Sequence, residues 1–402
     1  MQPNQGHSTK PLRIIVSGGG TGGHIYPAIA IADELKRLRP DTEFLFVGAT
    51  GRMEMKKVPM AGYEIKGLWI SGLLRKFTLD NLSFPFKVIH SLWTSRKIIK
   101  SFKPDVVVGT GGYAGGPVLY AAAKMGIPTL IQEPNAFAGL ANKWLGKHMD
   151  KICVAFPGME KFFPKDKLVE TGNPVREEML GRVLSLSPSP SPRERGDGSD
   201  TTGVTGDTPM SPLSGGEGPG ERVLLMGGSG GARSMNEALR DNTELLGARP
   251  QVQWMWQCGT AYYEAFKDCA SAQLPNVTIS AFIDDMEQAY VDADIVIGRA
   301  GSTTIAEIQF LGKPTILVPS PWVAEDHQTM NARALTERDA AVLVADKDLT
   351  EQLVSTVYEL FDDEARRKEL GQNARAMAQT GAVTRIANEV LNLIPSSPKS
   401  AN

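Results

Sequence analysis

Short apolar runs alternate with longer amphipathic stretches along almost the whole chain. In the first half, each apolar run is bounded by, or lies near, glycine or proline, which predicts the buried strands Leu12–Ser17, Glu43–Val47, Asp105–Val108, Thr129–Ile131 and Lys151–Val154. Helical patterns such as Ile25–Leu38 lie between several of them. Strands that alternate with helices predict βαβ units and a parallel sheet.

The same pattern starts again in the second half. The second series of predicted strands is Val223–Met226, Val252–Trp256, Val277–Ser280, Ile295–Ile297 and Thr315–Val318. Helical patterns at Ser234–Leu245 and Thr303–Leu311 lie between them. The fold class is therefore predicted as α/β, with two Rossmann-like, doubly wound parallel-sheet domains at residues 12–176 and 221–380.

Three segments fall outside these two domains. Residues 184–220 are rich in Ser, Pro, Gly and Asp, so we expect a flexible insertion, with a functional binding tail as the alternative. Residues 1–11 are polar and lack the apolar core of a signal peptide, so we expect a disordered terminus. Within the helical stretch Glu351–Ile394, residues 381–396 are expected to form a helix that crosses back to the first domain.

Composition removes several classes of function. The 402 residues carry a net charge of −2, so no overall basic field favours nucleic acid. The three cysteines show no CxxC spacing, which indicates free thiols in a reducing compartment and argues against a structural zinc site. No apolar run reaches the length of a transmembrane helix, so we expect a cytoplasmic protein, free or resting on a membrane surface.

Glycine-rich loops follow three of the predicted strands. They are Gly18–His24, Thr110–Pro117 and Gly227–Ala232, and a predicted helix follows the first and the last. Glycines let the backbone approach a ligand closely, and a helix amino terminus favours a negative group. A dinucleotide cofactor would require an acid at the end of the second strand, but that strand ends at Val47 and is followed by Gly48, Ala49 and Thr50. The loops therefore favour a diphosphate-bearing ligand in a crevice between the domains.

Polar clusters follow other strands. Ser302, Thr303 and Thr304 open a predicted helix, where hydroxyls can cap the helix or donate to phosphate, and Glu307 lies one turn further on. Glu307 either accepts the hydroxyls of a ribose or faces solvent. The segments Gln132–Asn135 and Glu325–Ala332 add polar groups at strand ends. Asp326 and His327 are adjacent without a spaced third ligand, which is poor metal geometry.

His24 is the one histidine on a glycine loop. An imidazole there can take a proton from a hydroxyl near neutral pH, and a helix amino terminus lowers its pKa. Two interpretations remain open from the residues alone: His24 is a general base, or its ring packs and contacts a ligand.

A basic and apolar stretch lies between Lys66 and Lys103. Its only acid is Asp80, and its basic residues alternate with apolar ones that include Trp69, Phe86 and Trp93. Basic residues around exposed apolar side chains hold a protein on anionic lipid. Burial of these apolar groups in the core is the alternative.

Seven ordered segments resemble the MurG family of GT-B glycosyltransferases. They are Gly18–Ala30, Gly109–Pro117, Gln132–Asn142, Gly172–Arg176, Gly227–Asn236, Arg299–Glu307 and Val318–Ala332. The resemblance implies two domains that face each other across a cleft. It implies inverting transfer of N-acetylglucosamine from UDP-N-acetylglucosamine to the C4 hydroxyl of undecaprenyl-diphospho-N-acetylmuramoyl-pentapeptide (lipid I), which gives lipid II.

The resemblance also implies roles for individual residues. His24 is the candidate base, and Glu307 is expected on the ribose. The residues expected at the donor are Thr21, Gly22, Gly23, Asn135, Arg176, Ser229, Ile283, Ser302, Thr303, Thr304, Ile305, Ala306, Glu307 and Gln328. No metal or other cofactor is expected to be obligatory.

The resemblance further implies a peripheral enzyme on the cytoplasmic face of the inner membrane, with an anionic membrane surface and cell-wall synthesis or division proteins as partners. Two other hypotheses are a GT-B transferase with another lipid or natural-product acceptor and a non-catalytic sugar-nucleotide-binding subunit. The complete set of glycine loops disfavours the latter.

Overall fold

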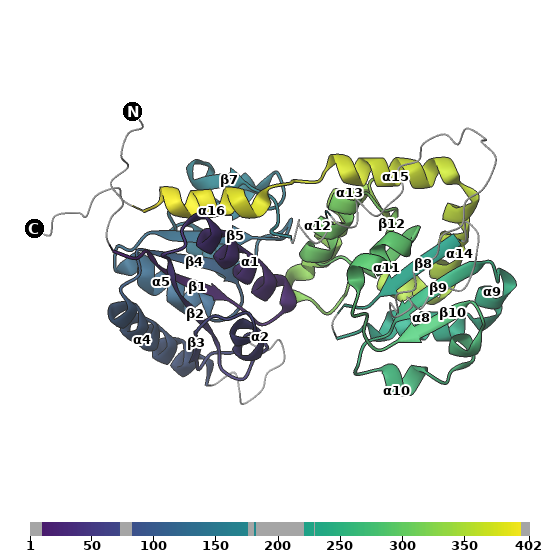
Figure 1. Ribbon diagram of the computed structural model, residues 1–402, viewed down its shortest axis with the longest axis horizontal. Coiled ribbons are helices and arrows are strands. Elements are labelled where there is room, and N and C mark those ends of the chain that lie inside the picture. Colours follow the sequence, from purple (N-terminus) through teal and green to yellow (C-terminus); the bar gives the residue numbers. More distant parts are fainter. Residues whose placement is uncertain (1–9, 73–82, 176–180, 182–220, 229, 395–402) are drawn as a thin grey trace, which may run out of the picture.

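The computed structural model describes residues 10–72, 83–175, 181, 221–228 and 230–394. Two α/β domains lie side by side, each built on a sheet covered by helices (Figure 1). All strand pairs among the described residues are parallel. Parallel strands end at one edge of a sheet, so the loops that follow them gather there.

The first domain contains a seven-stranded sheet in the order β3-β2-β1-β4-β5-β6-β7. Its strands are β1 (Arg13–Gly18), β2 (Glu43–Ala49), β3 (Ile65–Leu68), β4 (Val106–Gly111), β5 (Thr129–Glu133), β6 (Lys151–Val154) and β7 (Leu168–Glu170). Its described helices are α1 (Gly22–Leu38), α2 (Glu54–Met60), α4 (Phe84–Phe102), α5 (Gly115–Lys124) and α6 (Leu140–Gly146), with short 3-10 turns η1 (Met159–Lys161) and η2 (Lys165–Lys167).

The second domain contains a six-stranded sheet in the order β10-β9-β8-β11-β12-β13. Its strands are β8 (Glu221–Met226), β9 (Val252–Gln257), β10 (Val277–Ser280), β11 (Ile295–Arg299), β12 (Thr315–Val318) and β13 (Val342–Leu343). Its described helices are α8 (Arg233–Asp241), α9 (Thr243–Ala248), α10 (Tyr263–Phe266), α11 (Met286–Asp292), α12 (Ser302–Leu311), α13 (His327–Thr336), α14 (Leu349–Asp362) and α15 (Glu364–Ala376), with the 3-10 turns η3 (Ala270–Gln273), η4 (Ala324–Asp326) and η5 (Asp346–Asp348).

The central strands are apolar on both faces because helices cover both sides of each sheet. In β1, Ile14, Ile15 and Val16 have no exposed surface. Ile15 packs in the cluster that includes α5, while Ile14 and Val16 pack in the cluster on the α1 side. A continuous apolar run rather than an alternating one is what a strand buried on both faces requires.

The structure corrects one predicted helix and adds short strands. The helix predicted over Ser234–Leu245 is wrong as a single element, because it breaks at Asn242 between α8 and α9. The Asn242 Nδ2 donates to the carbonyls of Ala238 and Thr350 at 2.8 Å each, and such side-chain bonds compete with helix continuation. Strands β3, β7 and β13 are too short to show a clear apolar run in the sequence.

The last helix leaves the second domain and packs on the first. Helix α16 (Ala382–Asn392) lies along α1 at the top of the first domain (Figure 1), and its Ile386, Ala387 and Val390 belong to the core cluster of α1 and β1. Arg385 donates to the carbonyl of Thr171 at 2.6 Å, and Thr384 donates to Glu34 at 2.6 Å. The chain therefore crosses between the domains twice.

Some expectations fall on residues that the structure does not describe. They are the disordered terminus, described only at residues 10 and 11, and the insertion at 184–220. Among the described residues, no helix combines the length and the apolar character that a membrane span needs.

The docking of α16 gives a stability prediction. Ile386→Ala removes a fully buried side chain from the cluster shared with α1, so we expect a loss of about 2–5 kcal/mol in the free energy of unfolding. Urea denaturation followed by circular dichroism measures it. Asn388→Ala changes an exposed position of the same helix and should leave the transition nearly unchanged. Equal transitions for both variants would contradict the packing of α16.

Candidate active site between the two domains

The first glycine loop joins β1 to α1, and its backbone packs closely against Thr110 and His24. A Cβ on Gly18 would lie 2.1 Å from Thr110 Oγ1 and 2.7 Å from the carbonyl oxygen of His24. The Thr110 hydroxyl itself donates to that carbonyl at 2.7 Å. The end of β4 and the start of α1 are thereby tied together, which places His24 in the first turn of α1.

The His24 ring is held in one tautomer. Its Nδ1 lies 2.7 Å from the carbonyl oxygen of Thr110, and a carbonyl can only accept, so Nδ1 carries the proton. Nε2 then keeps its lone pair and can accept a proton from a ligand. Gly111 allows this contact, because a Cβ there would lie 2.5 Å from His24 Nδ1.

Several groups act on the pKa of His24, and the net direction is down from its ordinary value. Burial is the largest cause, because a half-buried ring loses solvation of its charged form. The hydrogen bond to Thr110 raises the pKa, while His327 of the second domain disfavours another positive charge. The carboxylate of Glu54 raises it. A lowered pKa keeps the imidazole neutral, as a base at neutral pH must be.

Glu54 lies beneath the first glycine loop and is almost fully buried, with 1% of its surface exposed. Its Oε2 accepts from the backbone N–H of Gly20 and its Oε1 from that of Ala49, both at 2.9 Å. The carboxylate thus fastens the tip of the loop to the end of β2. The sequence did not single out Glu54, because an acidic residue in a short helix after a strand usually faces solvent.

Helix α12 presents its amino terminus to the first domain. Ser302 is buried, and the buried Thr303 Oγ1 has no hydrogen-bond partner among the described residues. A Cβ on Gly23 would lie 3.9 Å from that hydroxyl, so the first turns of α1 and α12 face each other. Two helix amino termini in one cleft make a favourable place for a diphosphate.

Glu307 lies in the second turn of α12 and is held by Tyr290. The Tyr290 hydroxyl, on α11, donates to Glu307 Oε2 at 2.9 Å. Burial is the main reason that the pKa of Tyr290 lies well above its ordinary value, and Glu307 adds to it. Tyr290 is a second residue that the sequence did not reveal, because a buried tyrosine in a helix is usually core.

The other predicted donor residues of the second domain surround α12. Gln328, on α13, accepts at Oε1 from the backbone N–H of Ser320 at 2.8 Å, which leaves its Nε2 available to a ligand. Ile283 is half-buried in the loop between β10 and α11. Ile305 is buried in the core beneath the helix, so only its backbone can meet a ligand.

An ion pair braces the strand ends behind this site. The guanidinium of Arg299, at the end of β11, lies 2.5 Å from Asp346 and donates to the hydroxyl of Ser234 at 2.8 Å. Ser234 in turn donates to Asp346 at 2.7 Å. The start of α8 is thereby fixed against β11, next to the loop that contains Ser229.

On the first domain, Asn135 follows β5 in a loop organised by Glu133. This buried carboxylate accepts from the backbone and side-chain N–H groups of Asn135 at 3.1 and 3.2 Å, and from Asn142 Nδ2 at 2.8 Å. Burial raises the pKa of Glu133, and these donors oppose that shift. The loop is thus rigid where Asn135 meets the second domain.

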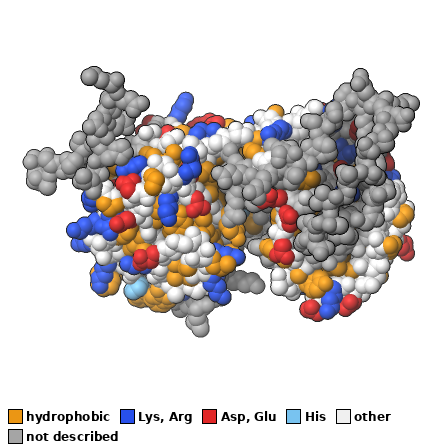
Figure 2. All heavy atoms as spheres, in the orientation of Figure 1, with side chains coloured by type: hydrophobic (Ala, Val, Ile, Leu, Met, Phe, Trp, Pro, Cys, Tyr) orange, Lys and Arg blue, Asp and Glu red, His pale blue; other side chains and the backbone are white. Residues whose placement is uncertain are grey.

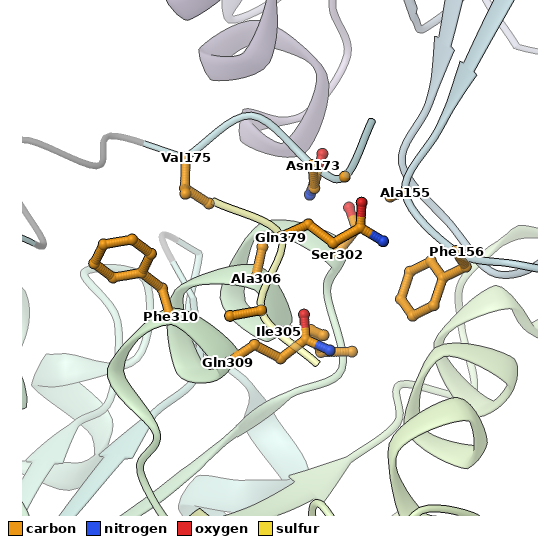
Figure 3. Close-up of a pocket in the computed structure, with 12 residues that line it drawn as sticks. Ala155, Phe156, Asn173, Val175, Ser302, Ile305, Ala306, Gln309, Phe310 and Gln379 are labelled. Carbon is orange, nitrogen blue, oxygen red and sulfur yellow. The ribbon is translucent and has the colours of Figure 1, made fainter. Parts of the chain in front are cut away.

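A pocket also lies between the domains beside helix α12. Figure 3 shows Asn173 and Val175 of the first domain opposite Ile305, Ala306 and Phe310 of α12. The linker residues Ala378 and Gln379 complete its wall. Ser302, Ile305 and Ala306 of the predicted donor set line this pocket, whereas His24 and Asn135 do not.

The predicted site residues lie on both domains, and two contacts join the two sides: Gly23 faces Thr303, and Asn135 accepts from Asn331. Thr21, Gly22, Gly23, His24 and Asn135 lie at strand ends of the first domain, and Ser302–Glu307, Ile283 and Gln328 lie in the second. Arg176 and Ser229 lie outside the described residues.

The described residues show no cluster of metal ligands and only free thiols. Among these residues, no three His, Cys, Asp or Glu side chains are grouped for a metal ion. The three cysteines are free, and burial raises the pKa of the Cys153 thiol to about 12 and of Cys258 to about 11. Such thiols are inert.

Comparison with known families gives two matches. Residues 14–154 match the glycosyltransferase family 28 N-terminal domain, and residues 222–389 match the glycosyltransferase family 28 C-terminal domain.

Curated relatives match nearly the whole chain. A protein of Cytophaga hutchinsonii is 47% identical over 97% of this chain and 99% of its own length, and one of Parabacteroides distasonis is 46% identical over 96% and 99%. Both are named UDP-N-acetylglucosamine–N-acetylmuramyl-(pentapeptide) pyrophosphoryl-undecaprenol N-acetylglucosamine transferase.

Solved structures share the two-domain arrangement. The crystal structure of Acinetobacter baumannii MurG is 28% identical, covers 95% of this chain and 100% of its own, and has a TM-score of 0.70. The glycosyltransferase of kitacinnamycin is 16% identical, covers 96% of this chain and 100% of its own, and has a TM-score of 0.64, so it supports the fold alone.

The contact between Glu54 and the glycine loop gives a prediction for His24. Glu54→Gln removes the negative charge that raises the pKa of His24, so we expect that pKa to fall further. It also leaves an amide N–H facing a backbone N–H. Nuclear magnetic resonance titration of the His24 ring measures the change. Glu64→Gln alters an exposed acid and should have no effect. A His24 pKa that is the same in both variants would exclude electrostatic coupling.

Proposed function

The chain belongs to glycosyltransferase family 28 and, within it, to the MurG family, and we propose how the site between its two domains acts. The enzyme transfers N-acetylglucosamine from UDP-N-acetylglucosamine to undecaprenyl-diphospho-N-acetylmuramoyl-pentapeptide (lipid I), which gives lipid II for peptidoglycan synthesis. The observation that carries the proposed mechanism is the fixed tautomer of His24 at a cleft whose opposite wall begins with α12.

The second domain holds the nucleotide in this proposal. Glu307 accepts the ribose hydroxyls, and Tyr290 orients its carboxylate for that contact. Ile283 meets the uracil through its backbone. Ser302–Ala306 and the loop with Ser229 meet the diphosphate, and Arg176 adds a positive charge. The unpartnered Thr303 hydroxyl supports this placement, because a buried polar group without a partner is costly unless a ligand completes it.

The sugar lies between the domains in the same proposal. Thr21, Gly22 and Gly23 border the donor from the first turn of α1, Asn135 lies beside the transferred sugar, and Gln328 contacts it through Nε2. In the first turn of α1 the N–H of His24 already donates to the carbonyl of Thr21 at 3.1 Å, so the N–H groups of Gly22 and Gly23 are the ones that suit a polar ligand.

Proton transfer begins at the acceptor. His24 Nε2 takes the proton from the muramyl C4 hydroxyl while that oxygen attacks the anomeric carbon from the face opposite UDP. The bond from the anomeric carbon to the diphosphate oxygen breaks, and its electron pair leaves with UDP, so the configuration inverts. Helix α12 and the β8–α8 loop stabilise the negative charge that grows on the diphosphate, without an obligatory metal.

A surface of the first domain supports membrane contact. On α4, Phe86, Ile89 and Trp93 are 69%, 67% and 56% exposed and share one face at this spacing. The ammonium of Lys97 lies 3.3 Å from the centre of the Trp93 ring, and Trp69 is 51% exposed nearby. Figure 2 shows basic and hydrophobic side chains together at this edge of the first domain.

Some apolar residues between Lys66 and Lys103 are buried in the core, and others are exposed. Leu68 and Ile70 are buried, so they belong to the core. Residues 73–82, with Arg75 and Lys76, lie outside the described residues. We propose that the exposed remainder holds the enzyme peripherally on anionic lipid at the cytoplasmic face of the inner membrane, where lipid I is embedded.

The proposed base gives a kinetic prediction. Because burial lowers the pKa of His24, turnover with a lipid I analogue should persist below pH 6.5 and fall only as the ring becomes protonated. His24→Ala should lower kcat by about 10²–10⁴-fold and remove that acid limb. Affinity for UDP should stay close to that of the wild type. An unchanged kcat would exclude His24 as the base, and absent transfer by the wild type would refute the proposed reaction.

The membrane surface gives a second prediction. Replacing Phe86 and Trp93 together by Ala removes two exposed apolar side chains, each worth about 1.5–3 kcal/mol when fully buried. Sedimentation with vesicles that contain anionic phospholipid should show at least about tenfold weaker binding. Leu245→Ala removes an exposed apolar group of the second domain and serves as control. Equal binding by wild type and double variant would rule out this surface.

A further inference from the structure

A chain of polar side chains crosses between the domains beside the cleft. Glu133 Oε1 accepts from Asn135 Nδ2 at 3.2 Å, and Asn135 Oδ1 accepts from Nδ2 of Asn331 at 3.1 Å. Asn331 Oδ1 accepts from the backbone N–H of Ala136 at 2.8 Å. Asn331 lies on α13 of the second domain and has no exposed surface. Its amide therefore completes a network that begins in the other domain.

Each amide in this network has one orientation that satisfies its neighbours. Glu133 Oε1 also accepts from the backbone N–H of Asn135 at 3.1 Å, so Asn135 directs its Nδ2 to that acceptor and its Oδ1 toward the second domain. The N–H of Ala136 only donates, so Asn331 must direct its Oδ1 to it. Nδ2 of Asn331 then donates to Asn135 and to the carbonyl of Ala300, 3.2 Å away. Turning either amide over would place donor against donor or acceptor against acceptor.

A second contact supports the same junction. Glu325, just before α13, accepts at Oε1 from the backbone N–H of Leu140 at 3.1 Å. Glu325 and the following Asp326 both have left-handed backbones, with φ of 55° and 51°. Two adjacent non-glycine residues in that region are strained, and such strain persists where other contacts hold it. The segment that leads into α13 is therefore shaped to meet the loop that contains Asn135.

We propose that Asn331 is a positioning residue, which aligns the amide of Asn135 for the transferred sugar when the two domains close. This inference rests on the proposed function, in which Asn135 lies beside the sugar. In the network, Asn135 retains one N–H and one lone pair, so it can both donate to and accept from sugar hydroxyls. The alignment is complete only when the nucleotide-holding domain is closed, so sugar recognition is coupled to closure.

A double-variant cycle with purified full-length protein tests the coupling. Asn135→Ala and Asn331→Ala should each lower kcat/KM for UDP-N-acetylglucosamine by about tenfold to a hundredfold. The double variant should be no worse than Asn135→Ala, because Asn331 acts through Asn135. Affinity for UDP, measured by titration calorimetry, should stay within about twofold of the wild type in all variants, because UDP lacks the sugar.

Two further variants guard against a merely structural effect. Asn331→Asp has the same size and still accepts from Ala136 but cannot donate, so it should match Asn331→Ala and replaces it if alanine lowers stability too far. Asn242→Ala removes another buried amide of the second domain, which donates to two carbonyls away from the cleft. This variant should lower the stability of the protein and leave kcat and KM for UDP-N-acetylglucosamine unchanged.

The outcomes separate this inference from the proposed function. Two results would overturn the positioning role even if the wild type transfers the sugar. One is a double variant whose loss in kcat/KM is the product of the two single losses. The other is an Asn331→Ala variant that loses as much affinity for UDP as it loses in kcat/KM. No transfer to a lipid I analogue by either the wild type or Asn242→Ala would refute the proposed function itself.

Discussion

Parallel pairing in both sheets is the constraint on which the site depends. It brings the loops that follow the described strands of each sheet to one edge. The first turns of α1 and α12 approach across the cleft. An inverting transfer needs this arrangement, since a base on one side must face a leaving diphosphate on the other.

Within that frame, buried polar groups give the site its chemistry. Thr110 fixes the tautomer of His24, Glu54 fastens the loop tip, and Tyr290 directs Glu307. Each of these groups is satisfied by a partner in its own domain. Asn331 differs, because its partners include Asn135 and Ala136 of the other domain. Each domain thus holds its own part of the site, and the buried amide of Asn331 needs contact between the two domains.

The sequence predicted the two parallel-sheet domains because their elements leave periodic signals. Buried strands read as apolar runs, and His24, Asn135 and Glu307 stand on polar or glycine-rich segments at strand ends. The break between α8 and α9 at Asn242 was not predicted, because it depends on a contact with Thr350, far away in the chain. The contacts of Glu54 with Gly20 and of Tyr290 with Glu307 were not predicted for the same reason, since only the folded chain brings these residues together.

In the proposed complex, the nucleotide lies on α12 and the sugar lies against His24 and Asn135. A crystal structure of the full-length enzyme with UDP-N-acetylglucosamine tests this placement most directly. We expect the ribose on Glu307, the diphosphate at the amino terminus of α12, and the anomeric carbon on the side of His24. Electron density for the nucleotide on the β1–α1 loop, away from Glu307, would contradict it.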